Sequence, residues 1–110
     1  MIELNPQNFG KEVLKSKQPV AVEFYVSYSG PCIELAPIIK VVEKKYAGKM
    51  NFARLDSEKY AEIAAKYINV DTEIPSIIFF KDGEEVDRVL GSYSEYALNA
   101  KIDNILVMKK

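Results

Sequence analysis

Two short and almost purely apolar runs constrain the fold of this chain more than any other feature of its sequence. Residues 20–26 (VAVEFYV) are apolar except at Glu23, and residues 76–80 (SIIFF) carry no charge. Such runs are typical of strands that are covered on both faces of a sheet. Between them, five apolar residues recur at steps of three and four, which predicts a helix over about 32–46: Cys32, Leu35, Ile39, Val42 and Tyr46. This alternation predicts an α/β fold.

The rest of the chain extends the same alternation. Strands are expected over residues 2–4, 51–55 and 85–90, and helices over about 7–17, 57–67 and 94–107. Asn5 is expected to cap the first helix, and the apolar face of that helix would carry Phe9, Val13 and Leu14. The Lys-Asp-Gly-Glu segment at 81–84 predicts a tight hairpin. These elements predict a single domain over residues 1–110, with a central mixed sheet and helices on both faces.

The charged and nucleophilic residues exclude several classes of function. Fifteen Lys and Arg against sixteen Asp and Glu leave a net charge of −1, which argues against a surface for nucleic acid or anionic membranes. The chain has no histidine, so a Ser-His-Asp or Cys-His arrangement and an imidazole-bound metal are excluded. Its one cysteine cannot form an internal disulfide or a thiolate zinc site. No metal site of either kind is therefore expected.

The expected compartment follows from the same sequence. The first residues show no basic stretch followed by an apolar run, so no secretory signal peptide is expected. The longest uncharged apolar run, residues 74–80, is too short to cross a bilayer. Because the chain also has no disulfide framework, a reducing cytoplasm is the expected location.

The segment that follows the first apolar run carries the most specific motif. It reads FYVSYSGPC over residues 24–32, with Pro37 five residues beyond the cysteine. Further features follow in order: Ile74-Pro75-Ser76, Asp82-Gly83 and Gly91. In this order and spacing, these features resemble the thioredoxin family over essentially the whole chain. The resemblance implies a thioredoxin-like fold and protein-disulfide reductase activity, with no metal and no bound organic cofactor. It also implies a monomer that acts on disulfide-bearing proteins and is recharged by a thioredoxin reductase.

One position departs from the pattern of that family. The family carries Cys-Gly-Pro-Cys where this chain has Ser29-Gly30-Pro31-Cys32. The resemblance therefore places Ser29 at the attacking position and Cys32 at the position of the thiol that resolves the mixed disulfide. Disulfide exchange requires a thiolate, and nucleophilic serines depend on an adjacent base, most often a histidine. We therefore expect the two-electron cycle of the family to be absent.

Ser29 also has a purely structural interpretation, because serine is a preferred residue at a helix N-cap. Both interpretations can hold together. Two origins of the serine are compatible with the sequence: a cysteine that was exchanged for serine by design, and a natural loss of the cysteine. The first is favoured because the exchange changes a single atom within an otherwise complete motif.

Two further residues have competing interpretations. Cys32 is either a small apolar core residue or, by the resemblance, a resolving thiol without its partner. Glu23 either faces solvent through strand alternation or, by the resemblance, matches a buried acid behind the active thiols, where burial would raise its pKa and suit it to move the proton of Cys32. Arg54 matches a position near that acid and could lower the cost of burying it.

The resemblance also implies a substrate surface. It implies a cis peptide bond between Ile74 and Pro75, facing the site. The backbone of Ile74 would then bind an extended peptide by strand addition. The surrounding apolar patch would consist of Tyr28, Gly30, Pro31, Ile74 and Gly91. Tyr25 is expected to pack in the core rather than to contact substrate.

Two other functions remain compatible with the sequence. One is a redox-silent module that keeps the peptide groove and serves as a scaffold. The other is a one-cysteine redox sensor, which would need an accessible Cys32 with a low pKa.

Overall fold

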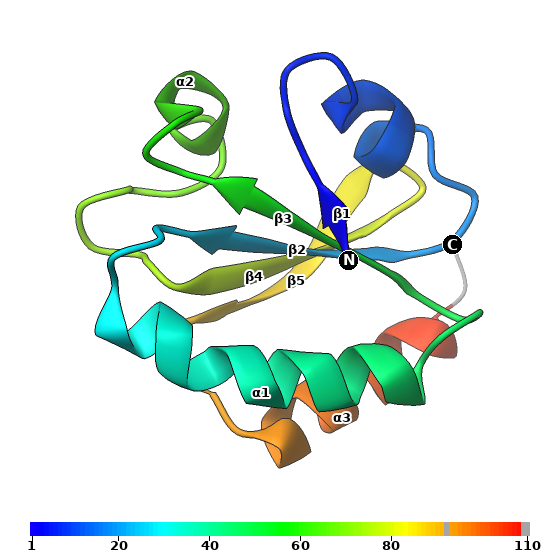
Figure 1. Ribbon diagram of the computed structural model, residues 1–110. Coiled ribbons are helices and arrows are strands. Elements are labelled where there is room, and N and C mark those ends of the chain that lie inside the picture. Colours follow the sequence, from blue (N-terminus) through cyan, green and yellow to red (C-terminus); the bar gives the residue numbers. More distant parts are fainter. Residues whose placement is uncertain (92, 109–110) are drawn as a thin grey trace.

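The computed structural model describes residues 1–91 and 93–108, and it is built around one five-stranded sheet with the order β1-β3-β2-β4-β5 (Figure 1). The strands are β1 (Ile2–Glu3), β2 (Val20–Tyr25), β3 (Asn51–Asp56), β4 (Ser76–Lys81) and β5 (Glu84–Leu90). β3 pairs in parallel with β1 and β2, whereas β4 pairs antiparallel with β2 and with β5. The predicted mixed sheet is confirmed.

Helices cover both faces of this sheet. α1 (Gly30–Lys45) and α3 (Glu95–Leu106) lie on one face, and the short helices η1 (Gly10–Leu14) and α2 (Ala61–Ala64) lie on the other (Figure 1). In the described part of the chain, no helix has the length and apolar character needed to cross a membrane. The predicted α/β class is confirmed.

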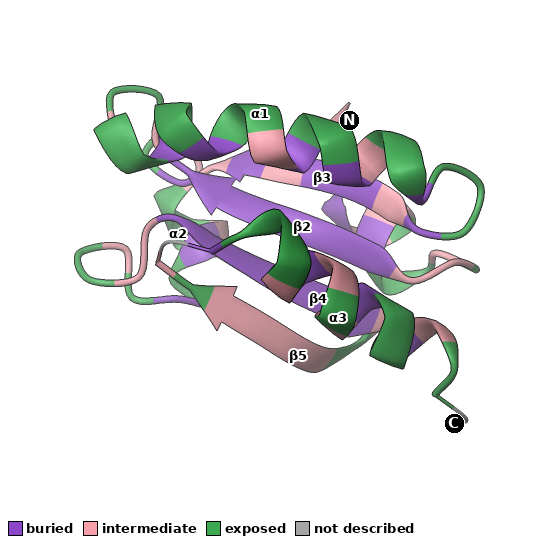
Figure 2. Cartoon of the chain, turned by 90° about the horizontal axis from the view of Figure 1, so that it is seen from below, coloured by how far each residue is buried: buried purple, intermediate pink, exposed green. Residues whose placement is uncertain are grey.

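Strand β2 is the centre of the molecule. All six of its residues are buried, as the purple colour in Figure 2 shows. Because successive side chains of a strand point to opposite faces, Ala21 packs in the cluster under α1 and α3, while Val20, Val22 and Phe24 pack in the cluster under η1 and α2. The near-continuous apolar run at 20–26 thus reflects a strand that is covered on both sides.

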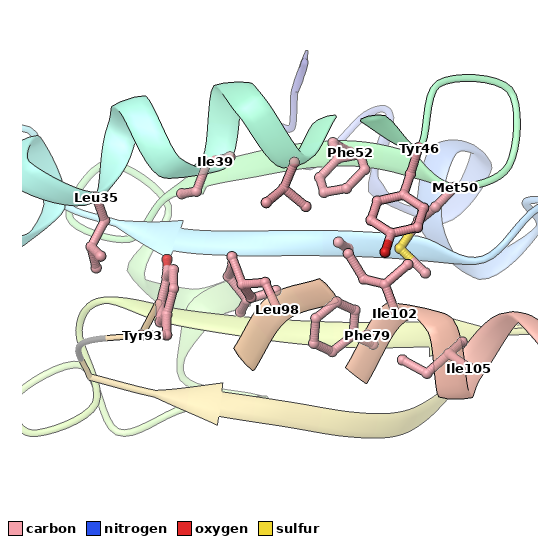
Figure 3. Close-up of a cluster of buried hydrophobic side chains, with 13 residues drawn as sticks. Leu35, Ile39, Tyr46, Met50, Phe52, Phe79, Tyr93, Leu98, Ile102 and Ile105 are labelled. Atoms are coloured by element: carbon pink, nitrogen blue, oxygen red, sulfur yellow. The ribbon is translucent and has the colours of Figure 1, made fainter. Parts of the chain in front are cut away.

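Helix α1 uses the apolar stripe that the sequence predicts. Cys32, Leu35, Ile39 and Val42 are buried within it, and Tyr46 is buried at its C-cap. Figure 3 shows members of this stripe packed over side chains of the sheet and of α3. The chain leaves the helix through Gly48, whose φ of 83° lies in the left-handed region that glycine adopts without strain.

The predicted helices over 7–17 and 57–67 are wrong in extent. The first is a five-residue helix of π type, Gly10–Leu14. In the turn before it, the Asn5 side chain accepts hydrogen bonds from the backbone N–H groups of Gln7 and Asn8, which are the contacts expected of the predicted cap. Leu14, expected on the apolar face, is 41% exposed. The second is reduced to Ala61–Ala64. In the turn before it, the Asp56 carboxylate accepts hydrogen bonds from the backbone N–H groups of Glu58 and Lys59.

The predicted hairpin at 81–84 is confirmed. Asp82 and Gly83 have positive φ values of 54° and 82°, as a two-residue hairpin turn of the primed type requires. A Cβ atom on Gly83 would lie 2.7 Å from the backbone oxygen of Leu14. Glycine is therefore required here both by conformation and by the close approach of η1.

Candidate functional site

The motif of the sequence lies where the chain leaves β2 and enters α1. Ser29 is the N-cap of α1, with extended backbone angles of φ −79° and ψ 124°. Its hydroxyl oxygen accepts a hydrogen bond from the backbone N–H of Cys32 at 3.4 Å, and its carbonyl oxygen accepts from the N–H of Ile33 at 3.1 Å. The structural interpretation of Ser29 as a helix cap is confirmed.

Cys32 lies in the first turn of α1 and points inward. It is 7% exposed and carries a free thiol. The side chain of Ser29 thus lies at the rim of the helix start, partly accessible, while the sulfur lies beneath the surface. This is the relative placement that the resemblance implies for an attacking and a resolving position.

Glu23 is buried in the middle of β2, with 6% of its surface exposed. Together with Cys32 it lines a cavity of about 180 Å³. Burial raises the pKa of the Glu23 carboxyl; the charge of Arg54 lowers it in part, and the charge of Glu3 adds to the rise. The alternative of a solvent-facing Glu23 is therefore wrong.

Arg54 is the cation beside this buried acid. The β2–β3 register places Arg54 next to Glu23. Its guanidinium carbon lies 3.7 Å from the centroid of the Tyr25 ring, and its Nε lies 3.1 Å from a carboxylate oxygen of Glu3. The expected placement of Arg54 near the acid is confirmed, and Tyr25 is buried, as expected of a core residue.

The loop before β4 reaches the same end of the sheet. β4 begins at Ser76, which pairs with Phe24 of β2, so Pro75 lies beside the end of β2. The Ile74–Pro75 peptide bond is cis, as the resemblance implied. The N–H of Gly91 donates to the carbonyl of Pro75 at 2.8 Å, which ties the end of β5 to this loop. Figure 1 shows the start of α1 and the loop that leads into β4 on the same side of the molecule.

The expected substrate patch is only partly apolar in character. Tyr28 is 72% exposed, and a hydrogen bond to Glu58 raises the pKa of its phenol. Gly30 and Pro31 form the exposed first turn of α1, and Ile74 is half-buried at the loop. Within the described residues, the backbone of Ile74 makes no hydrogen bond to another backbone group, so its N–H and carbonyl are not used by the sheet.

Sequence reasoning missed Tyr93, which lies between β5 and α3. Tyr93 is 7% exposed, and Figure 3 shows its hydroxyl directed toward β2, under α1. Burial raises the pKa of the Tyr93 phenol, and the charges of Glu23 and Cys32 raise it further. The sequence offered no signal for this residue, since it lies in a polar Ser-Tyr-Ser stretch outside every apolar pattern.

Other hollows of the surface lie near and far from this site. A hollow of about 600 Å³ shares four lining residues with the small cavity and extends along α1 to Lys40 and Glu43: Glu23, Ile33, Ala36 and Arg54. A hollow of about 620 Å³ lies between η1 and α2 and contains none of the motif residues. The buried acid and the thiol therefore mark the site better than the size of a hollow does.

The sheet order, with α1 and α3 packed on one face, is that of a thioredoxin-like domain, and its only thiol lies at the first turn of α1. A family model described as Thioredoxin matches residues 1–104. The chain belongs to the thioredoxin family.

Relatives from plants and bacteria are similar to almost the whole chain. Thioredoxin C-2 of Corynebacterium nephridii is 33% identical over 103 residues, which cover 94% of each protein. The chloroplastic M-type thioredoxins of Pisum sativum and Spinacia oleracea are 34% and 33% identical over 94% of this chain. The chain spans 59% and 56% of the length of these two plant relatives.

Proposed function

We propose that this chain is a thiol–disulfide oxidoreductase of the thioredoxin family in which Ser29 occupies the attacking position, so that it binds substrates without completing disulfide reduction. The observation that carries the proposal is the place of the Ser29 hydroxyl. It caps α1 through the N–H of Cys32, one helical turn from the only cysteine of the chain. A sulfur atom in that place would have the helix N-terminus to stabilise its thiolate.

The chemistry of exchange explains why an oxygen is insufficient. In the complete cycle, a thiolate at position 29 attacks a substrate disulfide, and one substrate sulfur leaves as a thiolate. The thiolate of Cys32 then attacks the sulfur of residue 29, which releases the second substrate thiolate and leaves a disulfide between positions 29 and 32. Two electrons pass to the substrate. Ser29 cannot form either sulfur–sulfur bond, so both steps are lost.

Cys32 alone supports half of an exchange. Its thiolate can attack an accessible disulfide to give one mixed disulfide and one free thiolate. Release of the bound half then needs a thiol from outside the chain. Since Cys32 is buried, we expect this reaction to be slow, and the same burial argues against a rapid redox sensor.

Glu23 has the properties of a proton acceptor for Cys32. It lines the same small cavity as the thiol, and burial raises its pKa toward the range where proton transfer from a thiol becomes easier. Arg54, next to Glu23 in the sheet, stabilises the carboxylate once it forms.

The loop at Ile74 supports substrate binding by strand addition. Its backbone N–H and carbonyl are not engaged by the sheet within the described residues, and an extended peptide can pair with such groups. The exposed ring of Tyr28 and the first turn of α1 would border that peptide. Disulfide-bearing proteins are the proposed partners, with a thioredoxin reductase as electron donor for a chain that carries the missing thiol. A cytoplasmic location stays a prediction.

The experiment restores the sulfur. Ser29→Cys is expected to reduce insulin disulfides with dithiothreitol as the electron source, whereas the unchanged chain and Ser29→Ala should show only the rate of dithiothreitol alone. In the absence of dithiothreitol, Ser29→Cys combined with Cys32→Ser should accumulate a mixed disulfide with substrate, because no thiol is present to resolve it. An unchanged chain as active as Ser29→Cys would contradict the proposal.

A second candidate function is a redox-silent scaffold that binds extended peptides. The observation that favours it is the use of the Ser29 hydroxyl as a helix cap, a role that needs no redox chemistry. If Ser29→Cys folds but stays inactive while the unchanged chain still binds the peptide, the scaffold is the better description.

A further inference from the structure

The hydroxyl of Tyr93 is an unusual polar atom for the interior of this molecule. It is buried and has no hydrogen-bond partner within the described residues. The tyrosine belongs to the cluster under α1 and α3, together with Leu35, Ala21 and Ile77. A hydroxyl that is buried without a partner destabilises the fold, so an apolar side chain would serve packing better here. A hydrogen-bond acceptor near this hydroxyl would offset the cost of burying it.

The geometry of the fold shows which groups surround it. Ala21 of β2 packs in the same cluster as Tyr93, and strand alternation directs the side chain of Glu23, two residues further, into the same layer. Leu35, which follows Cys32 by one helical turn, also contacts this cluster. In Figure 3 the Tyr93 oxygen points away from the apolar centre and toward β2. The acid, the thiol and the phenol thus face one layer between β2 and α1.

The charges agree with this placement. The charges of Glu23 and of Cys32 both raise the pKa of the Tyr93 phenol, in addition to burial. A phenol with a raised pKa keeps its proton at neutral pH, and it therefore acts as a hydrogen-bond donor rather than as a base. Its candidate acceptor is the carboxylate of Glu23, which lies in the same layer.

We propose that Tyr93 is a positioning residue whose hydroxyl donates a hydrogen bond to the Glu23 carboxylate through one buried water molecule, and so stabilises the ionised acid beneath Cys32. This proposal rests on the role given above to Glu23 as proton acceptor. Two groups would then stabilise the Glu23 carboxylate: the cation of Arg54 on β3, and the neutral hydroxyl of Tyr93 on the opposite side of the layer.

Several charged groups lie around Glu23, and a test has to distinguish their effects on its pKa from the effect of the Tyr93 hydroxyl. They come from every element around it: Arg54 of β3, Glu3 of β1, Cys32 of α1, Tyr25 of β2, and Lys40 and Glu43 along the adjoining hollow. None of them is altered by Tyr93→Phe, which removes one oxygen atom and keeps the ring. A change in the titration of Glu23 in this variant therefore reports the hydroxyl.

The experiment is a ¹³C NMR titration of the Glu23 side-chain carboxyl in the unchanged chain and in Tyr93→Phe, with Glu23→Gln to assign the resonance. Tyr46→Phe is the matched control. Tyr46 is a buried tyrosine of the same cluster, but its hydroxyl donates to Asp103 at 2.7 Å instead. Because a donor stabilises the carboxylate, Tyr93→Phe is expected to raise the pKa of Glu23 by about one to two units, and Tyr46→Phe should leave it unchanged.

Two results would overturn the proposal. One is a Glu23 pKa that rises by less than about half a unit in Tyr93→Phe, which would make Tyr93 a packing residue only. The other is an equal rise in Tyr46→Phe, which would assign the effect to a general loosening of the cluster. The titration uses the chain with Ser29 and no substrate, so its outcome is independent of the disulfide-reduction assay. A failed assay would reject the proposed function and leave the pairing of Tyr93 with Glu23 standing.

Discussion

Replacing Glu23 by glutamine keeps the shape of the side chain and removes its ability to ionise. The carboxyl has an ordinary pKa of 4.5, and burial in β2 raises it in the folded chain despite the opposing charge of Arg54. A raised pKa means that the folded state holds this proton at pH values where the unfolded state has lost it. The stability that the proton confers is therefore complete below about pH 4.5 and is lost as the pH rises through the folded pKa.

The size of this effect follows from linkage. Each unit by which the folded pKa exceeds the unfolded one removes about 1.4 kcal/mol from the free energy of unfolding at high pH. Glu23→Gln does not undergo this loss. The free energy of unfolding of Glu23→Gln minus that of the original chain should therefore increase with pH up to the folded pKa of Glu23 and stay constant above it. Arg54→Gln removes the cation that lowers this pKa, so the loss should extend to higher pH.

Urea denaturation at a series of pH values from about 4 to 9 measures this difference. Glu62→Gln, an exchange at an exposed position of α2, is the control and should follow the original chain at every pH. A constant difference between Glu23→Gln and the original chain over the whole range would show that the folded state does not raise the pKa of Glu23. It would refute the argument that a buried acid lies behind Cys32.

Three further substitutions test the fold around the site. Ser29→Ala should lower the free energy of unfolding by about 0.5–1 kcal/mol, at the weak end for an N-cap because the bond to the Cys32 N–H is 3.4 Å long; an unchanged urea midpoint would show that the cap contributes nothing. Ile102→Ala removes a fully buried side chain of α3 and should cost about 2–5 kcal/mol, whereas a loss below about 1 kcal/mol would mean that the cluster under α1 and α3 is loosely packed. Gly83→Ala should destabilise the fold more than Gly48→Ala does. The two glycines share a φ near 80°, but only at Gly83 would a Cβ atom lie 2.7 Å from a backbone atom. Equal decreases of the melting temperature in the two variants would contradict the close approach to Leu14.

The parts of the fold that could be predicted are those whose pattern is local. The runs at 20–26 and 76–80 predict strands covered on both faces, because nearly every residue in them is apolar. The stripe of α1 follows from a helical period, and Ser29 as its N-cap follows from residue type. The short extent of the helix at Gly10–Leu14 could not be predicted from period alone, because an apolar period locates the buried face of a helix and not the residues where its regular hydrogen bonding begins and ends.

The parts of the site that could not be predicted depend on contacts between distant segments. Whether Glu23 is buried was left open by the sequence, because a buried carboxylate depends on Arg54, which only the β2–β3 register brings beside it. Tyr93 was missed entirely, because its burial depends on residues of β2, α1 and α3 that are distant from it in the sequence. The resemblance to thioredoxins supplied the cis bond at Pro75, which no local pattern of this chain indicates.

The most direct measurement is a single exposure of reduced chain to a protein disulfide, with no other reductant present, followed by mass spectrometry of both partners. In Ser29→Cys, we expect one substrate disulfide to be opened for each disulfide that forms between positions 29 and 32. The original chain should leave the substrate oxidised, apart from a slow mixed disulfide at Cys32. Stoichiometric reduction of substrate by the original chain would contradict the claim that an oxygen stands where the attacking sulfur belongs.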